Sequence, residues 1–163
     1  MIFVTVGTHE QGFDRLIKHL DYLVECGKIS DDIIIQTGFT TFKPKYCQYS
    51  KFIDAPDMAT YMKSADLVIS HGGPATYMTA ISHNIPTIVV PRLSKFNEHV
   101  NDHQLDFANK VNRHSQYNLT VVTDIEDLHT QIINKLGSTQ EKIGKSNTSN
   151  FINKFTNLLE SMI

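Results

Sequence analysis

Residues 70–104 of the chain read SHGGPATYMTAISHNIPTIVVPRLSKFNEHVNDHQ, and this stretch predicts a glycine turn that joins a strand to a helix. An apolar run stops at His71, two glycines follow, and Pro74 suits the first position of a helix. Glycines let a backbone approach a ligand closely, and the unpaired N–H groups at a helix start favour an anion. Gly72 and Gly73 therefore form a candidate diphosphate site, although the same pattern also fits a plain helix cap.

The rest of the chain alternates short apolar runs with stretches of helical spacing. The apolar runs predict strands at residues 2–6, 33–36, 51–54, 65–69, 86–90 and 119–122. Helical spacing predicts helices at residues 13–24, 56–62, 74–83, 97–112 and 125–136. This alternation is typical of βαβ units, so the predicted fold class is α/β: a Rossmann-like, doubly wound parallel sheet of about six strands. We expect one domain over residues 1–136, a linker at 137–145 and an amphipathic helix at 146–163.

The same spacing predicts which side chains pack inward. In the helix at 74–83 the inward side is expected to hold Tyr77, Met78 and Ile81. In the helix at 97–112 it is expected to hold Val100, Phe107, Ala108 and Val111. Residues 39–50 lack periodicity and are predicted to form a loop.

Composition excludes several classes of function. The 163 residues are 40% apolar and 20% charged, with a formal charge of -2, which is ordinary for a globular protein and gives no sign of a nucleic-acid partner. No apolar run approaches the roughly 18 residues of a membrane-spanning helix, so we expect no direct membrane span. Cys26 and Cys47 lack metal-binding spacing, and free thiols in a reducing cytosol are the simplest interpretation.

Several loops with unusual residues are expected at one edge of the sheet. Ligands of doubly wound folds bind beyond the carboxyl ends of the strands. The segments predicted to lie there are residues 7–9, Gly38, residues 70–73 and residues 91–92. Their convergence is the main argument from the residues themselves for a binding site.

Two of these loops carry groups able to assist a reaction, each with an ordinary alternative. His9 is a candidate general base because imidazole titrates near neutral pH. Residues 8–11 also match a capping box at the start of the following helix. Arg92 is able to stabilise phosphate charge, and a surface salt bridge is an equal alternative.

The run Glu98-His99-Val100-Asn101-Asp102-His103-Gln104 is dense in hydrogen-bonding side chains. Carboxylates and amides of this kind bind sugar hydroxyls. His99 and His103 are spaced i, i+4, which would suit a metal ion if both lay on one helix. A solvated helix start is the third alternative.

Four motifs taken together resemble a known family. They are VTVGTH at residues 4–9, VISHGGPAT at 68–76, VPR at 90–92 and EHVNDHQ at 98–104. The set resembles the C-terminal, donor-binding half of GT-B glycosyltransferases, specifically the C-terminal domain of glycosyltransferase family 28. It is also similar to stand-alone catalytic subunits of bacterial capsule and exopolysaccharide β-1,4-galactosyltransferases and of the dolichol-linked N-acetylglucosamine transferase.

The resemblance implies a hexosyltransferase that needs no cofactor or metal. Residues 1–136 would bind a UDP-sugar, and a sugar, galactose in the first instance, would pass with inversion to a lipid-linked saccharide acceptor in capsule or exopolysaccharide synthesis. A membrane-anchored partner subunit would supply the acceptor half, so the chain would be cytoplasmic and peripheral at the inner face of the membrane. The final helix would dock on that partner or fold back on the sheet. Alternatives are a non-catalytic UDP-sugar-binding regulatory subunit and a transferase that uses UDP-N-acetylglucosamine.

The resemblance also implies roles for individual residues. His9 would be the catalytic base. The substrate-binding residues would be Gly7, Thr8, His71, Gly72, Gly73 and Thr76 at the diphosphate, Arg92 and Glu98 close by, and Asp102 and Gln104 at the donor sugar. Related enzymes often have a glutamate on the ribose three residues after the threonine of the turn, where this chain has Thr79.

Overall fold

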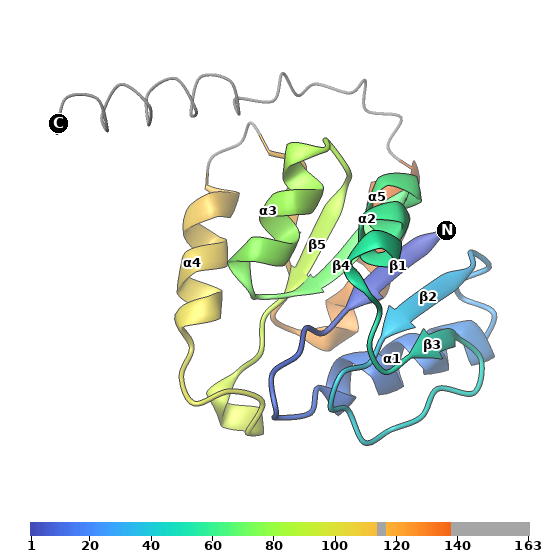
Figure 1. Cartoon of the computed structure of the whole chain (residues 1–163), viewed down its shortest axis with the longest axis horizontal. Helices are drawn as coiled ribbons and strands as arrows, with labels where there is room; N and C mark the ends of the chain where they lie inside the picture. Colours follow the sequence, from blue (N-terminus) through green and yellow to red (C-terminus); the bar gives the residue numbers. More distant parts are fainter. Residues whose placement is uncertain (114–116, 138–163) are drawn as a thin grey trace, which may run out of the picture.

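The computed structural model of the protein describes residues 1–113 and 117–137, and these form one parallel sheet with helices on both faces (Figure 1). The strands are β1 (Ile2–Thr5), β2 (Ile33–Gln36), β3 (Gln48–Ser50), β4 (Leu67–His71), β5 (Thr87–Val90) and β6 (Leu119–Val121). The α-helices are α1 (Asp14–Glu25), α2 (Ala55–Ser64), α3 (Pro74–Ser82), α4 (His103–Asn112) and α5 (Leu128–Gly137). Two 3-10 turns, η1 (Ser94–Phe96) and η2 (Ile125–Asp127), precede α4 and α5.

The strand order β3-β2-β1-β4-β5-β6 confirms the predicted α/β class. The order reverses beside β1, which is where doubly wound sheets open a crevice for ligands. Central β1, β4 and β5 are buried along their whole length, as expected for parallel strands covered on both faces.

Side chains of β1 alternate between two apolar layers, because successive residues of a strand point to opposite faces. Ile2 and Val4 pack with α1 and α5 on one face of the sheet. Phe3 packs with α2 and α3 on the other face, where a neighbouring cluster joins α3 to α4. The core therefore fixes the strand ends, and with them the loops at the carboxyl edge.

Two predicted elements are displaced in the structure. The third strand is β3 at residues 48–50 rather than 51–54, and all three of its residues are exposed at the sheet edge. The helix predicted at 97–112 begins only at His103. Asn97 has a φ of +57° after η1, and this left-handed conformation is incompatible with a continuous helix.

The packing predicted for these helices is accordingly wrong in part. Val100 lies before α4 and is 78% exposed. Phe107 and Met78 are also exposed, whereas Ala108, Tyr77 and Ile81 are buried as expected. Val111 packs against the cluster that these three residues form.

The predicted loop after β2 is held along α1 by two carboxylates. Asp14 accepts hydrogen bonds from the backbone N–H groups of Thr41 and Phe42. Asp21, which is buried, accepts the N–H group of Tyr46 at 2.7 Å and those of the residues on either side. This loop is therefore held in a defined position by hydrogen bonds to α1.

The predicted linker and the predicted C-terminal helix lie almost entirely outside the described residues. Gly137 belongs to α5, while the rest of the predicted linker at 137–145 and the whole predicted helix at 146–163 fall beyond it. Within the described ranges, no helix is both long and apolar enough to cross a membrane.

Candidate functional site

The carboxyl ends of β1, β4 and β5 bring the predicted loops together. Gly7 follows β1 with a φ of +73°, a conformation that favours glycine. Gly38 follows β2 with a φ of +55°, and a Cβ there would lie 2.5 Å from the carbonyl oxygen of Gly7. The first two strand ends are thus in direct backbone contact, as expected from their positions in the sequence.

The imidazole of His71 is wedged between the β1 loop and the glycine turn. A Cβ on Gly7 would lie 2.6 Å from its Cε1 atom, and a Cβ on Gly73 would lie 2.3 Å from its Nε2 atom. Its Nδ1 atom lies 3.3 Å from the carbonyl oxygen of Thr5, so Nδ1–H donates to that oxygen. Any side chain at either position would displace the ring. Glycine is therefore required at residues 7 and 73 because the imidazole lies so close to their backbone.

His71 is uncharged at neutral pH. Burial first, and then the nearby Arg92 guanidinium, lower its pKa from the usual 6.5 to about 4. The ring therefore adds no positive charge to the turn. An anion bound here would rely on backbone N–H groups and on the dipole of α3.

The start of α3 is built for such an anion. Gly73 is its N-cap with extended backbone, Pro74 follows, and among the described residues no side chain caps the helix end. Thr76, half-buried, lies in the first turn. The first N–H groups of an α-helix have no partner within the helix. Here Pro74 has no N–H, and that of Thr76 donates to the carbonyl oxygen of Gly73 at 3.2 Å. The N–H groups of Gly73 and Ala75 are therefore the ones that acceptor oxygens of a ligand would satisfy.

Gln104 packs on the turn from the other side, and Asp102 precedes it by two residues. A Cβ on Gly72 would lie 2.5 Å from Cβ of Gln104, so the first turn of α4 packs on the glycine turn. The Oε1 atom of Gln104 lies 3.4 Å from the backbone N of Arg92, which leaves its amide NH₂ as a donor. Asp102 is exposed and accepts the N–H of Ser94 at 2.7 Å, a bond that lowers the pKa of its carboxyl group.

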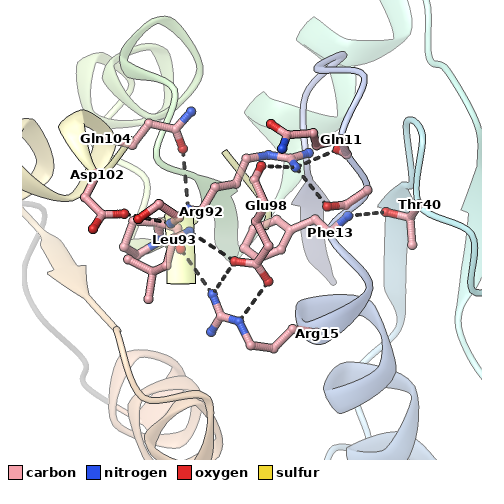
Figure 2. A network of polar contacts seen from close by, with 12 residues as sticks. Gln11, Phe13, Arg15, Thr40, Arg92, Leu93, Glu98, Asp102 and Gln104 are labelled. Atoms are coloured by element: carbon pink, nitrogen blue, oxygen red, sulfur yellow. Dashed lines mark hydrogen bonds and ion pairs between the residues drawn. The ribbon is translucent and has the colours of Figure 1, made fainter. Parts of the chain in front are cut away.

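Arg92 is completely buried and bonded to backbone oxygens, so the surface salt bridge considered for it is wrong. Its Nη1 atom donates to the carbonyl oxygens of Gln11, Gly12 and Glu98, and Nη2 donates to that of Val6 (Figure 2). Burial lowers its pKa to about 10, and the guanidinium stays charged at neutral pH. This residue joins the loops after β1 and β5, and its two terminal nitrogens are occupied by carbonyl groups.

Glu98 forms the buried counterpart of this arrangement. Its carboxylate accepts the Nε and Nη2 groups of Arg15, both at 2.9 Å, and the backbone N–H of Leu93 at 3.1 Å. Arg15 also donates to the carbonyl oxygen of Pro91. Figure 2 shows this carboxylate between the two guanidinium groups, so the polar loop after β5 is fastened to the start of α1.

His9 lies beside His99, with ring centroids 4.8 Å apart. Its Nδ1 atom accepts the backbone N–H of Gln11 at 3.2 Å. Burial and then the neighbouring His99 lower the pKa of His9. The predicted capping box at residues 8–11 is wrong, because α1 begins at Asp14 with Phe13 as its N-cap.

The metal alternative assumed that His99 and His103 lie one turn apart on the same helix, and this is also wrong. His99 lies in the loop before α4, and His103 is the first residue of that helix. Within residues 1–113 and 117–137, no group of three or more histidine, cysteine or acidic side chains is arranged to hold a metal ion.

Sequence reasoning missed three contributors to the site. Arg15 sits next to apolar residues of α1 and reads as an ordinary exposed position, yet it pairs with a carboxylate 83 residues away. Gln11 was considered only within the capping box, and its backbone in fact bonds both His9 and Arg92. His99 is predicted only as a metal ligand or as a member of the polar run at residues 98–104, and nothing in its spacing indicates a partner at His9.

Solved structures that are similar to this chain include glycosyltransferases. The glycotransferase of kitacinnamycin matches with a TM-score of 0.63 and 12% identity, over 84% of this chain and 35% of its own. The calicheamicin glycosyltransferase CalG4 matches with a TM-score of 0.62 and 11% identity, over 98% of this chain and 41% of its own. The glycosyltransferase VinC, solved in complex with dTDP, matches with a TM-score of 0.55 and 14% identity, over 84% of this chain and 33% of its own. The chain thus spans about a third to two fifths of the length of these enzymes, and at such identities the likeness concerns the fold.

No curated protein matches the chain. The model of the glycosyltransferase family 28 C-terminal domain, in contrast, matches residues 1–162, which is nearly the whole chain. The protein therefore belongs to the glycosyltransferase family 28 C-terminal domain family.

Proposed function

We propose that this chain is the donor-binding, catalytic subunit of an inverting glycosyltransferase that uses a UDP-sugar. The observation that carries the proposal is the uncapped start of α3, where Gly72 and Gly73 leave no room for side chains beneath Gln104 and His71. Backbone N–H groups at that helix end would hold the diphosphate. The free amide of Gln104, with Asp102 beside it, would hold hydroxyls of the donor sugar.

The proposed reaction needs no metal to stabilise the leaving group. In the transition state the bond from the anomeric carbon to the diphosphate lengthens, and negative charge grows on the diphosphate oxygens. Fixed N–H dipoles aimed at that position stabilise the charge without reorganisation. Neutral His71 supports the turn sterically, and Gly7 and Thr8 would border the diphosphate from the β1 side.

A base must take the proton of the attacking hydroxyl. His9 is the candidate that the sequence predicts, and in the structure it pairs with His99, with both imidazoles close enough to His71 of the turn to act on it electrostatically. Arg92 and Glu98 are bonded within the loops, so we assign them the role of positioning these loops.

The acceptor half would come from a second protein. The chain matches 35–41% of the length of two of the similar glycosyltransferases, and an acceptor-binding half would make up the difference. We propose a membrane-anchored partner subunit, which would place this chain at the cytoplasmic face of the membrane. The acceptor would be a lipid-linked saccharide of capsule or exopolysaccharide synthesis, and galactose is the sugar that the sequence resemblance favours.

Recognition of the ribose is expected to differ from that of related enzymes. Thr79 stands where a glutamate is often found, and its hydroxyl donates to the carbonyl oxygen of Ala75 at 2.8 Å. The side chain is therefore bonded within α3, and the ribose hydroxyls would be bound by other groups.

Calorimetry with UDP, followed by transfer of labelled galactose from UDP-galactose, tests the proposal. We expect the full chain to bind UDP, and the transfer to require the partner and a lipid-linked acceptor. Binding of UDP without any transfer in the presence of the partner would favour the regulatory alternative. Absence of UDP binding would contradict both.

A further inference from the structure

The two neighbouring imidazoles, His9 and His99, present opposite hydrogen-bonding groups. Each ring is held through its Nδ1 atom by the backbone of its own loop. The partner of Nδ1 decides which nitrogen of a neutral imidazole carries the proton. The Nε2 atoms of the two rings therefore differ in what they offer to a substrate.

His9 offers a donor. The partner of its Nδ1 atom is the N–H group of Gln11 at 3.2 Å, and a backbone N–H can only donate. Nδ1 must then be the accepting, unprotonated nitrogen, and the proton of the neutral ring lies on Nε2. Protonation of Nδ1 would place two N–H groups against each other, so this ring is poorly suited to take up a proton.

His99 offers an acceptor. Its Nδ1 atom lies 3.1 Å from the carbonyl oxygen of Asn101, and a carbonyl oxygen can only accept. The N–H of the same Asn101 is farther away, at 3.4 Å, and one Nδ1 atom cannot serve both groups. The nearer contact places the proton on Nδ1 and leaves the lone pair on Nε2.

We infer that His99, rather than His9, is the base that deprotonates the acceptor hydroxyl, and this inference rests on the proposed function. The hydroxyl oxygen forms its bond to the anomeric carbon, and its proton passes to Nε2 of His99. The bond from the anomeric carbon to the diphosphate breaks, and its electron pair leaves with the diphosphate. His9 keeps its Nε2 proton and serves as a hydrogen-bond donor.

Charged and titratable groups surround this pair on several elements. They are Glu10 in the loop after β1, His71 at the end of β4, Arg92 after β5, and Asp102 before α4. The buried Arg92 disfavours a second positive charge nearby, while Glu10 and Asp102 act in the opposite direction. The proton positions in the pair are best measured directly.

Nitrogen-15 NMR of the full chain, labelled at histidine, makes that measurement. His9→Gln and His99→Gln variants assign the two rings by loss of their signals. Above pH 7 we expect His9 to carry its proton on Nε2 and His99 on Nδ1. The reverse arrangement in His99 would overturn the inference, and this readout does not depend on whether the chain binds a nucleotide.

Hydrolysis of UDP-galactose, in which water replaces the acceptor, gives the kinetic test. His99→Ala should lower kcat by about 100-fold, the usual contribution of a general base, with the dissociation constant of UDP unchanged. His83→Ala, an exposed imidazole at the far end of α3, is the matched control and should keep the wild-type rate.

The remaining outcomes are distinguishable. If His99→Ala hydrolyses UDP-galactose at the wild-type rate while His9→Ala does not, the inference is wrong and the proposed function stands. If the wild-type chain binds no UDP, the proposed function fails, and the base assignment fails with it whatever the NMR result.

Discussion

The turn after β4 and the loop after β5 both border the candidate site, but different forces hold them in shape. Within the turn at residues 71–73 the shape comes from close approach, since a Cβ on Gly72 or Gly73 would lie 2.3–2.5 Å from a neighbouring side chain. In the loop at residues 91–102 it comes from buried charge, with Glu98 between Arg15 and Arg92. The turn should therefore tolerate the loss of a charged group but not the addition of a side chain at its glycines. The loop should tolerate an added side chain but not the loss of a buried charged group.

The difference also separates two kinds of residue within one site. The turn presents backbone groups to a ligand, so its side chains matter chiefly through the space they leave. In the loop, buried side chains hold the backbone, while Asp102 is exposed. Substitutions in the loop should thus act first on stability, and substitutions in the turn should act first on binding.

The largest effect is expected from Glu98→Ala. Removal of one partner of a buried ion pair leaves the other uncompensated, which costs about 3–5 kcal/mol. Urea unfolding should show a loss of this size, and Arg15→Ala should show a loss in the same direction. Because the two residues are coupled, the double variant should lose less than the sum. Additive losses would mean that the ion pair does not hold the loop.

Gly73→Ala should weaken UDP binding by about 1–3 kcal/mol, the usual cost of overpacking. The new Cβ would lie 2.3 Å from Nε2 of His71, and the turn would have to move. Gly137→Ala, where a Cβ meets no atom within 4 Å, is the matched control and should bind UDP normally.

The cause of that loss is tested by a second substitution. In Gly73→Ala with His71→Ala, the clash is gone, and calorimetry should show most of the UDP affinity restored relative to His71→Ala alone. A double variant as weak as Gly73→Ala would show that the glycine acts through its backbone conformation instead.

Acid should destabilise the turn although it carries no ionised side chain. The pKa of His71 falls from 6.5 in the unfolded chain to about 4 in the fold, so the unfolded state binds the proton more readily. The resulting stability, of the order of 2–4 kcal/mol, is fully present above pH 6.5 and is lost between pH 6.5 and 4. His71→Gln should flatten the free energy of unfolding against pH in this window. An unchanged slope would assign the acid sensitivity to other groups.

The smallest effect on stability is expected from Asp102→Asn. The side chain is exposed, and an amide oxygen can still accept the N–H of Ser94, so the free energy of unfolding should change by less than about 1 kcal/mol. If the carboxylate binds the donor sugar, the affinity for UDP-galactose should fall while that for UDP stays constant. If the substitution changes neither the affinity for UDP-galactose nor the affinity for UDP, Asp102 is not part of the sugar site.

Much of the fold was predictable because its signals are local. Buried strands of β-branched residues, such as Ile33–Gln36, stand out from the flanking polar residues. The edge strand β3 has no such signal, since Gln48, Tyr49 and Ser50 are all exposed. The start of α4 is predicted too early because residues 97–102 continue the helical pattern of the sequence but form a loop in the structure, which opens with the left-handed Asn97.

The site divides in the same way. Gly72, Gly73 and Gln104 were identified as candidates, because a glycine pair before a proline and an amide in a polar run are visible in the sequence. The distant partners of Arg92 and Glu98 were not, since Val6, Gln11, Gly12 and Arg15 lie 80 or more positions away along the chain. Their contacts depend on the loops after β1 and β5 meeting at the carboxyl edge, which only the assembled sheet determines.

A crystal structure of the full chain with UDP tests the central claim most directly. We expect the diphosphate at the start of α3, with its oxygens bonded to the backbone N–H groups of Gly73 and Ala75 and the glycine turn unmoved. A nucleotide bound at another edge of the sheet, with that helix start empty, would contradict the account.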